Sequence, residues 1–458
     1  MAIPSTIFRA YDIRGTYPEE LNAESAFLIG KGFASYLAKL GIKKPKVVCG
    51  RDNRTHSPEL QNGFIRGLTE SGCKVVNLNE SPSPYLYFAC TSGKFDAGCN
   101  ITASHNPKEY NGFKLMTKDA HAVFGAELKK IHGIIAANDF VLGTGSAENA
   151  DVTDKYLKTL TKLFKAKRKL KVVVDTANGV TSALYPKAIA ALGHTVIGLF
   201  TKSDGTFPSH EPDPIVEKNL ADLKQKVAET GADVGLAFDG DGDRVSLVTE
   251  RGVFINADHT LMLLAKDALS RHPGRTVVFT VSNSQSLFDL IHQWGGKPLM
   301  CKVGHSYVEH AMTEHKAIAG GEQSGHYFLP EGYYAYDDAL VTAGRLLKIL
   351  GDSKKSASGL FKEFPQTFAE AELRPNCPDL VKFGIIEKAS SFFQGQFPCN
   401  TMDGVRIDFG NGGWAGIRAS NTSPKLSITM EAQSPEELER IKGIVLGHLK
   451  TYPEIQWQ

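Results

Sequence analysis

The chain has 458 residues, of which 42% are hydrophobic and 22% are charged, and its formal net charge is +2. This length exceeds what one hydrophobic core usually organises and predicts about three or four domains. Because neither sign of charge dominates, the composition gives no electrostatic reason to expect a nucleic acid or a membrane surface as a partner.

The chemistry of the termini and of the cysteines indicates a cytoplasmic protein. The N-terminal MAIPSTIFRAYDIRG lacks the basic flank and the apolar segment of a signal peptide. No apolar run approaches the ~20 residues of a membrane span. The seven cysteines include no C-x-x-C pair and fit a reducing compartment.

An α/β pattern occurs three times along the chain. Each copy begins with a β-branched strand, namely VVCGRD (47–52), VVVDTA (172–177) and VVFTVS (277–282). A helical stretch, a second strand after a glycine, another helical stretch and a third apolar strand then follow. Apolar strands that alternate with helices are typical of a parallel sheet that is covered on both faces.

A polar loop follows the third strand of every copy. The three loops are TASHNP (102–107), DGDGDR (239–244) and GEQSGH (321–326), and a hairpin-like segment comes after each of them. The carboxyl end of such strands is the edge at which open α/β sheets bind ligands. The three loops therefore predict one site that is shared between domains, and the added hairpins make the sheets mixed.

The last part of the chain follows a different pattern. Strands dominate from about Phe368, and the chain closes with a helical segment, 434–452, whose Ser-Pro-Glu-Glu start suits a helix N-terminus. We predict three similar mixed-sheet α/β domains and a C-terminal α+β domain. The expected boundaries are 1–150, 151–255, 256–367 and 368–458.

The DGDGDR loop has the most constrained chemistry. Asp239, Asp241 and Asp243 alternate with glycines, so three carboxylates can converge on one small divalent cation, for which Mg²⁺ fits best. An EF-hand is excluded because Arg244 stands where its sharp turn needs glycine and a strand precedes the loop. A solvated acidic turn is the plainer alternative.

Ser104 in the TASHNP loop has no hydrolase context, because no nucleophile elbow or triad surrounds it. One reading pairs it with His105; the other makes it the carrier of a phosphoryl group beside the metal loop. Lys114 could then act as general acid–base, or it could simply extend from a hairpin to solvent. Arg14 could balance the phosphoryl charge or form a surface ion pair.

Two further loops suit a sugar phosphate. Glu322, Ser324 and His326 offer hydroxyl recognition, although a capped turn explains them as well. His305 follows a glycine at the same edge and could contact a ligand or pack. The loop RASNTSP (418–424) supplies a phosphate cradle from Arg418, Ser420, Asn421 and Thr422.

The ordered motifs TASHNP, DGDGDR, GEQSGH and RASNTSP resemble those of the α-D-phosphohexomutases. With FRAYDIRG (8–15), YNGFK (110–114) and SDGTFPSHEPDP (203–214), the likeness is to the bacterial phosphomannomutase/phosphoglucomutase group and covers essentially the whole chain. The resemblance implies four domains around a central cleft. It also implies reversible interconversion of hexose 1-phosphate and hexose 6-phosphate, of mannose or glucose, through a phosphoserine and a hexose 1,6-bisphosphate.

The same resemblance implies the residue roles and the ligands. One Mg²⁺ per chain and the hexose 1,6-bisphosphate are the expected cofactors, and small sugar phosphates are the expected partners of a monomer or weak dimer. The implied catalytic residues are Ser104, Arg14, Lys114 and His305. Metal ligands would be Ser104, Asp239, Asp241 and Asp243. Substrate contacts would come from Tyr11, Arg244, His305, Glu322, Ser324, His326, Arg418, Ser420, Asn421 and Thr422.

Some positions depart from the family pattern. Gln323 stands where many relatives have methionine, and glutamine there is common in phosphoglucosamine mutases. Residues 282–284 lack the basic residue that many relatives carry. A phosphoglucosamine mutase is therefore the alternative within the family, and a metal-dependent sugar phosphatase or a non-catalytic sugar-phosphate-binding protein are the alternatives outside it.

Overall fold

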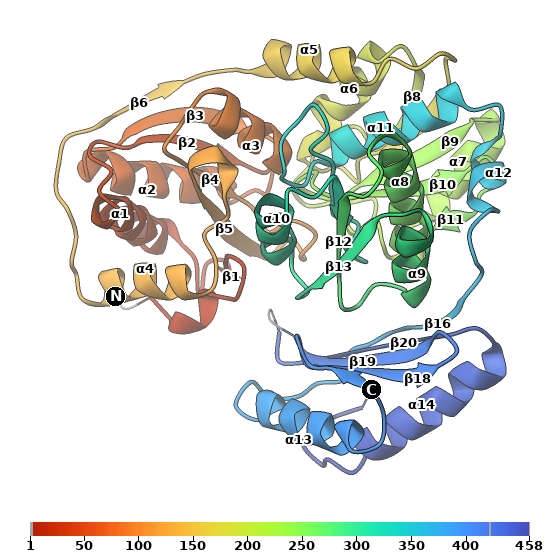
Figure 1. Ribbon diagram of the computed structural model, residues 1–458. Helices are drawn as coiled ribbons and strands as arrows, with labels where there is room; N and C mark the ends of the chain where they lie inside the picture. Colours follow the sequence, from red (N-terminus) through yellow and green to blue (C-terminus); the bar gives the residue numbers. More distant parts are fainter. Residues whose placement is uncertain (1–2, 421–422, 458) are drawn as a thin grey trace. The chain divides into compact units, whose positions relative to one another are not determined.

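A computed structural model describes residues 3–420 and 423–457 (Figure 1). By internal contacts the chain forms two compact units. The first comprises Met1–Ala257 and Ser324–Leu360, and the second comprises Asp258–Gln323 and Phe361–Gln458.

The first sheet of the first unit has the strand order β1-β5-β4-β2-β3-β6. Strands β2, β3, β4 and β6 run parallel, while β5 pairs antiparallel with β4 and β1. The strands are β1 (Ile13–Thr16), β2 (Lys46–Arg51), β3 (Lys74–Glu80), β4 (Ala97–Ile101), β5 (Tyr110–Thr117) and β6 (Ser146–Asn149). The helices are α1 (Ala23–Lys39), α2 (Ser57–Glu70), α3 (Ser83–Ser92) and α4 (Ala126–Ala136), with 3-10 turns at Ser5–Ile7 and Lys118–Ala120.

The second sheet repeats this arrangement in the order β11-β10-β9-β7-β8. Its antiparallel strand β10 again follows the polar loop and pairs with β9. The strands are β7 (Lys171–Asp175), β8 (Thr195–Leu199), β9 (Val234–Phe238), β10 (Val245–Thr249) and β11 (Phe254–Ile255). Its helices are α5 (Thr153–Leu163), α6 (Tyr185–Ala191) and α7 (Ala221–Thr230), with 3-10 turns at Val180–Ala183 and Glu217–Leu220. Strand β15 (Tyr327–Phe328), helix α11 (Ala339–Asp352) and helix α12 (Ala357–Phe361) follow much later in the chain.

The second unit contains the parallel strands of the third copy and the C-terminal domain. Strand β12 pairs parallel with β13 and β14. The elements of this part are α8 (Ala257–Arg271), β12 (Thr276–Thr280), α9 (Gln285–Gln293), β13 (Lys297–Cys301), α10 (His305–Glu314) and β14 (Ala319–Gly321).

The C-terminal sheet of the second unit is antiparallel throughout, in the order β16-β20-β19-β18-β17. Figure 1 shows helices α13 and α14 on the same side of this sheet. The elements are β16 (Phe368–Leu373), α13 (Lys382–Gln394), β17 (Cys399–Asn400), β18 (Val405–Gly410), β19 (Gly413–Ala419), β20 (Leu426–Ala432) and α14 (Pro435–Leu449). The Ser434 side chain caps α14 by accepting a hydrogen bond from the Glu437 amide, as its sequence predicts.

The sheets confirm the predicted class of mixed-sheet α/β domains with an α+β domain at the C-terminus. One expected hairpin is different: after β5 the chain makes a 3-10 turn in which Asp119 and Ala120 both have a φ of 61°. Two successive left-handed residues end the strand. The returning segment therefore forms only an isolated bridge between Met116 and Ala122.

Candidate active site

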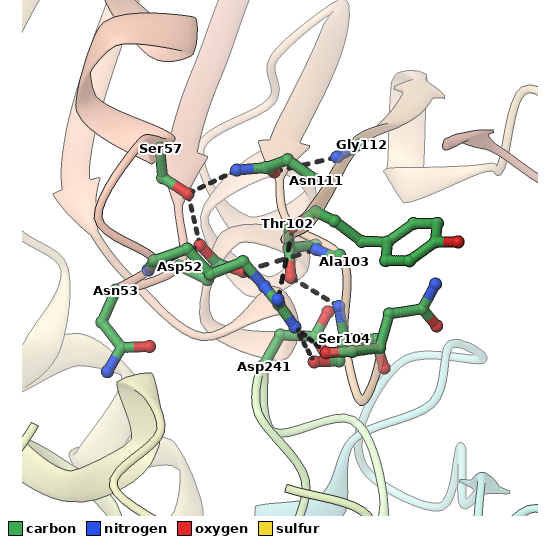
Figure 2. Close-up of polar contacts among 12 residues, drawn as sticks. Asp52, Asn53, Ser57, Thr102, Ala103, Ser104, Asn111, Gly112 and Asp241 are labelled. Atoms are coloured by element: carbon green, nitrogen blue, oxygen red, sulfur yellow. Dashed lines mark hydrogen bonds and ion pairs between the residues drawn. The ribbon is translucent and has the colours of Figure 1, made fainter. Parts of the chain in front are cut away.

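Ser104 lies directly after β4 and points to the metal loop of the neighbouring domain. It is 3% exposed, and its hydroxyl donates a hydrogen bond of 2.7 Å to Asp239 Oδ2. Its backbone amide donates to Thr102 Oγ1 at 2.9 Å, a contact that Figure 2 shows. The carrier proposed from sequence and the metal loop, 135 positions apart in the chain, thus meet within the first unit.

The alternative pairing of Ser104 with His105 has poorer geometry. His105 Nδ1 is 3.4 Å from Ser104 Oγ, against 2.7 Å for the Asp239 carboxylate. Burial, and then the charge of Arg244, hold the pKa of His105 well below its usual value. The shorter of the two contacts of the Ser104 hydroxyl is therefore the one with Asp239, which favours the phosphoryl-carrier reading over a His105–Ser104 dyad.

Three buried carboxylates converge in the loop between β9 and β10. One oxygen from each of Asp239, Asp241 and Asp243 lies within 4.8 Å of the others. The loop folds around its own first residue, because Asp239 Oδ1 accepts hydrogen bonds from the amides of Gly242 (2.9 Å) and Arg244 (3.1 Å).

Lys114, on the antiparallel strand β5, supplies positive charge to this loop. Its ammonium donates to Asp241 Oδ2 at 2.7 Å and to Asp243 Oδ2 at 2.5 Å. Burial alone would lower the pKa of Lys114, but the two carboxylates raise it well above its usual value. Lys114 is 6% exposed, so the reading of a lysine that extends into solvent is wrong.

The carboxylates respond to their surroundings in opposite ways. Burial and then the charges of Asp243 and Asp241 hold the pKa of Asp239 well above its usual value. Burial would do the same to Asp241 and Asp243, yet the Lys114 ammonium lowers both of these pKa values. Lys114 and Arg244, whose Nε lies 3.9 Å from Asp239 and 4.0 Å from Asp243, balance the charge of the trio only in part, as expected where like charges share a site.

A divalent cation fits these residues. Asp241 Oδ1 and Asp243 Oδ1 are buried, and neither accepts a hydrogen bond from any residue that the structure describes. Buried carboxylate oxygens without donors are hard ligands of the kind that Mg²⁺ takes. The plainer reading of a solvated acidic turn does not match side chains that are fully buried.

A second buried cluster, formed by His326 and Asp337, lies next to the three aspartates of the metal loop. His326 Nδ1 lies 2.6 Å from Asp337 Oδ2 and 3.6 Å from Asp243 Oδ1. The Arg244 side chain donates through Nε to His326 Nε2 at 2.9 Å. The structure therefore places the predicted substrate residues Arg244 and His326 beside the metal loop.

Arg14 and Tyr11 come from the start of the first domain. The Arg14 guanidinium donates to the carbonyl oxygen of Ala103 at 2.6 Å and forms an ion pair with Asp12. Arg14 thus lies against the loop that carries Ser104. Tyr11 is half-buried just before β1, and Ser324 is half-buried just before His326.

Glu322 and His305 lie at one edge of the third sheet, in the second unit. Glu322 Oε1 accepts a hydrogen bond of 2.7 Å from the amide of Gly304, the residue before α10, and His305 begins that helix. Asp403 Oδ2 accepts from the neighbouring Val303 amide at 3.0 Å. Glu322, predicted to grip sugar hydroxyls, and His305, predicted to contact the substrate, are thus tied to the same backbone turn.

The backbone of the Arg418 loop is hydrogen-bonded by a buried lysine, Lys382. Arg418 is the last residue but one of β19, and one of its guanidinium nitrogens lies 3.8 Å from Glu372. Lys382 donates to the carbonyl oxygens of Ser420 (2.6 Å) and Ser423 (3.0 Å). The predicted residues Asn421 and Thr422 lie outside the described residues.

Sequence reasoning missed three supporting residues. The Ser83 hydroxyl donates to Asp241 Oδ2 at 2.7 Å, Asp337 pairs with His326, and Lys382 holds the Arg418 loop. Ser83 reads as an ordinary helix start, and Lys382 as a surface lysine. Only Asp337, beside a second aspartate after a tyrosine run, offered a weak signal.

Comparison with known proteins identifies the family. Models of the phosphoglucomutase/phosphomannomutase family match domain by domain: domain I at residues 5–142, domain II at 154–252, domain III at 256–368 and the C-terminal domain at 371–447. The chain belongs to this family. The resemblance to the α-D-phosphohexomutases is thereby confirmed.

Individual family members are similar to this chain over nearly the whole length of both sequences. A phosphomannomutase/phosphoglucomutase of Pseudomonas syringae pv. tomato is 43% identical over 98% of this chain and 96% of its own. A phosphoglucomutase of Neisseria meningitidis serogroup A is 37% identical over 99% of both. A crystal structure of a family protein from Burkholderia thailandensis gives a TM-score of 0.92 at 36% identity, covering 99% of this chain and 100% of that one.

The chain is therefore an enzyme, an isomerase of the hexose phosphate mutase class, as predicted. Its acidic trio could bind a metal ion. No helix within the described residues 3–420 and 423–457 is both long enough and apolar enough to cross a membrane.

Proposed function

We propose that the enzyme interconverts the 1-phosphates and 6-phosphates of mannose or glucose by way of a phosphorylated Ser104. One observation supports this most strongly: the Ser104 hydroxyl lies 2.7 Å from a carboxylate of the metal loop. A phosphoryl group on that oxygen would face the cation that the loop could hold, which is the arrangement that phosphoryl transfer needs.

The proposed reaction has two transfers. In the first, the bond between phosphorus and Ser104 Oγ breaks as a bond to one sugar hydroxyl oxygen forms; that hydroxyl gives up a proton, and the freed Ser104 oxygen takes one up. The resulting hexose 1,6-bisphosphate turns around. In the second, the bond between the other phosphorus and its sugar oxygen breaks as a bond to Ser104 Oγ forms; the Ser104 hydroxyl gives up its proton, and the released sugar oxygen takes one up. Atoms balance over the cycle, because the enzyme ends phosphorylated as it began.

Mg²⁺ is the proposed metal, held by Asp239, Asp241, Asp243 and the phosphate on Ser104. When bound, it would neutralise charge on the transferring group. The carboxylates hold their places through Ser83, Lys114 and the loop amides.

Lys114 and Arg14 are proposed to balance charge around the phosphoryl group. Because the pKa of Lys114 is raised well above its usual value, the side chain stays an ammonium. An ammonium at this place could donate a proton or stabilise charge on the transferring group. Arg14 contacts the Ala103 carbonyl, one residue from Ser104.

The remaining predicted residues are proposed to hold the sugar and its other phosphate. Glu322, Ser324, His305 and His326 would contact hydroxyl groups, together with Tyr11 and Arg244. Arg418 offers a planar fork for phosphate, and Ser420, Asn421 and Thr422 would complete that cradle. We further propose that small sugar phosphates are its partners and the cytoplasm its location.

A coupled assay tests this function and ranks the sugars. Glucose 1-phosphate, mannose 1-phosphate and glucosamine 1-phosphate are supplied separately with Mg²⁺ and a trace of glucose 1,6-bisphosphate. We expect formation of the 6-phosphates of glucose or mannose to exceed that of glucosamine 6-phosphate. A dominant glucosamine activity would replace the proposal by the aminosugar mutase of the same family.

Two controls distinguish the mutase from a phosphatase and from a binding protein. Net release of inorganic phosphate at the rate of sugar conversion would indicate a phosphatase. Ser104→Ala should abolish turnover, by about ten-thousandfold or more, while leaving the thermal unfolding midpoint near that of the wild type. A Ser104→Ala variant that still isomerises sugar phosphates would contradict the phosphoserine, and a wild type without any turnover would indicate a binding protein.

A further inference from the structure

Arg54 is a fully buried arginine outside the residues assigned above. It lies between β2 and α2, is 1% exposed and heads, by volume, the fully buried side chains of residues 3–420 and 423–457. A guanidinium is costly to remove from water unless its donors all find acceptors. The partners of Arg54 therefore indicate what holds it there.

The acceptors of Arg54 are mostly backbone oxygens of one loop, residues 104–110. Its Nη2 donates to the carbonyl oxygens of Ser104 (2.9 Å) and Asn106 (2.6 Å). Its Nη1 donates to those of Pro107 (2.6 Å) and Tyr110 (3.3 Å). Nε pairs with Asp52 at 3.0 Å. One planar cation thus gathers four carbonyl groups of the loop that carries Ser104.

The segment 52–57, in which Arg54 lies, also holds the start of the loop that carries Ser104. Figure 2 shows Asp52 between Ser57 and the backbone of Ala103. Asp52 accepts from the Ser57 hydroxyl at 2.5 Å and from the Ala103 amide at 3.4 Å. Asn111 in turn donates to Ser57 Oγ at 2.8 Å. The loop is therefore fixed at both ends from the segment 52–57.

This support matters because Ser104 has an uncommon backbone conformation. Its φ is +50°, in the left-handed region that serine rarely adopts. Such a residue keeps its conformation only when its surroundings determine it. The Arg54 bond to the Ser104 carbonyl supplies that constraint, and the hydroxyl consequently reaches Asp239.

The segment 203–214 of the second domain, so far without a role, covers Arg54. The Phe207 ring centroid lies 5.0 Å from the Arg54 guanidinium carbon. Asn53 donates to Ser203 Oγ at 2.9 Å and to the Asn178 carbonyl at 2.7 Å. At Gly205 a Cβ would come within 2.1 Å of the Asn53 carbonyl oxygen, so only glycine permits this approach. The segment closes one side of the guanidinium against water.

We propose that Arg54 is a positioning residue for phosphoryl transfer, which sets the conformation of Ser104 from behind and is shielded by Phe207. The proposal rests on the proposed function of Ser104 as phosphate carrier. Arg54 would act through the loop backbone and would not touch the sugar. A purely structural Arg54 would affect stability alone.

The test is Arg54→Lys, which keeps the charge but offers a single nitrogen for four carbonyl groups. We expect kcat to fall by about a hundredfold while KM for the sugar phosphate stays within about threefold, because the sugar-binding loops are untouched. Protein-bound label from ³²P-labelled glucose 1,6-bisphosphate should appear more slowly by a similar factor. Arg66→Lys is the matched control: Arg66 also stacks on a phenylalanine, with its guanidinium carbon 4.4 Å from the Phe27 ring centroid. It lies in the middle of α2 instead of at the Ser104 loop, and its kinetics should equal the wild type.

Phe207→Leu decides the question if Arg54→Lys does not fold, as judged by its thermal unfolding. It retains Arg54 and removes only the ring, and the labelling rate should fall by about fivefold or more. The proposal is overturned if a folded Arg54→Lys keeps kcat within about threefold of the wild type. With Arg54→Lys unfolded, a wild-type labelling rate in Phe207→Leu overturns it equally.

Ser104→Ala in the same labelling experiment keeps the two proposals apart. If Ser104→Ala incorporates label as the wild type does, the phosphoserine itself is wrong, whatever Arg54 does. If only Ser104→Ala loses label and Arg54→Lys behaves as the wild type, the carrier stands and the positioning role fails.

Discussion

The loops that follow β4 and β9 occupy the same place in two copies of one sheet, yet they are held in different ways. The second loop joins the paired residues Phe238 and Val245 by six residues, and Asp239 accepts the amides of its own turn. The first loop also has bonds of its own, from the Asn106 amide to the Ala103 carbonyl and from the Tyr110 amide to the Pro107 carbonyl. Four of its carbonyl groups, however, are held by the side chain of Arg54, some fifty residues earlier.

The difference follows from what each loop must present. Carboxylates can both bind a cation and cap a short turn, so the metal loop is in part self-organised through Asp239, with further hydrogen bonds from Ser83 and Tyr185 outside it. A serine hydroxyl cannot organise the eight residues of backbone between β4 and β5, and a distant guanidinium holds many of their carbonyl groups instead. Sequence motifs therefore locate the metal loop and its ligands together, while they locate only the functional residue of the serine loop.

The largest expected effect comes from breaking the self-organised loop. Asp243→Asn removes one carboxylate of the trio and one partner of Lys114, and kcat/KM should fall by about a thousandfold. Dialysis against a chelator should abolish wild-type activity, and Mg²⁺ should restore it. The exposed Asp222→Asn in the same domain is the control. Retention of full activity by Asp243→Asn would contradict the metal assignment.

A buried carboxylate without a cation sharpens the comparison. Asp338 caps α11 by accepting hydrogen bonds from the backbone amides of Leu340 and Val341. Its carboxylate also accepts hydrogen bonds from the hydroxyl groups of Tyr156 and Tyr333. Burial raises its pKa from 3.8 to about 6, whereas Lys114 lowers that of Asp243. Hydrogen bonds from neutral groups thus do not offset burial as a nearby ammonium does.

The raised pKa of Asp338 predicts a pH dependence of stability. The folded state binds the proton more tightly than the unfolded state, so this contribution is full below about pH 4 and is lost as pH rises through about 6. The free energy of unfolding of the wild type should fall relative to that of Asp338→Asn by about 3 kcal/mol as the pH rises over that range. Urea unfolding at several pH values measures it, with the exposed Asp154→Asn as control. A difference independent of pH would refute the shift.

The contact between the two loops can itself be disturbed. At Gly240 a Cβ would lie 2.5 Å from the Ser104 carbonyl oxygen, so Gly240→Ala must move the loops apart. We expect a loss of about 1–3 kcal/mol in the free energy of unfolding and a lower kcat. Gly133→Ala is the control, because its Cβ meets no atom within 4 Å and a helical alanine is favoured. Equal stability of both variants would show that the loops yield easily.

The smallest expected effect concerns the Arg418 loop, which like the serine loop is held by a distant cation. Lys382→Ala removes the donor to Ser420 and Ser423. KM for the sugar phosphate should rise by about tenfold while kcat changes less, since the residue supports binding. Lys388, exposed on the same helix, provides the control substitution to alanine. An unchanged KM would remove Lys382 from the phosphate site.

Sequence alone predicted the repeated sheets and the Asp239–Asp243 loop, because their signals are local. It also predicted Lys114 as a site residue, but not its hydrogen bonds to Asp241 and Asp243. These depend on the register in which Lys114 lies opposite Asn100, and a slip by one residue would turn the side chain to the other face. Arg54 was invisible, since a buried arginine and a surface arginine look the same in sequence. Its acceptors are backbone carbonyl groups, which carry no sequence signal.

The chain crosses between its two compact units after Ala257, Gln323 and Leu360. A truncated chain that ends after the second copy would therefore lack α11, and Tyr156 would lose its Asp338 acceptor. Arg244 would likewise lose His326. A chimera that exchanges one compact unit between relatives should therefore keep Ser324–Leu360 from the same parent as Met1–Ala257. Its other parent would supply Asp258–Gln323 and Phe361–Gln458.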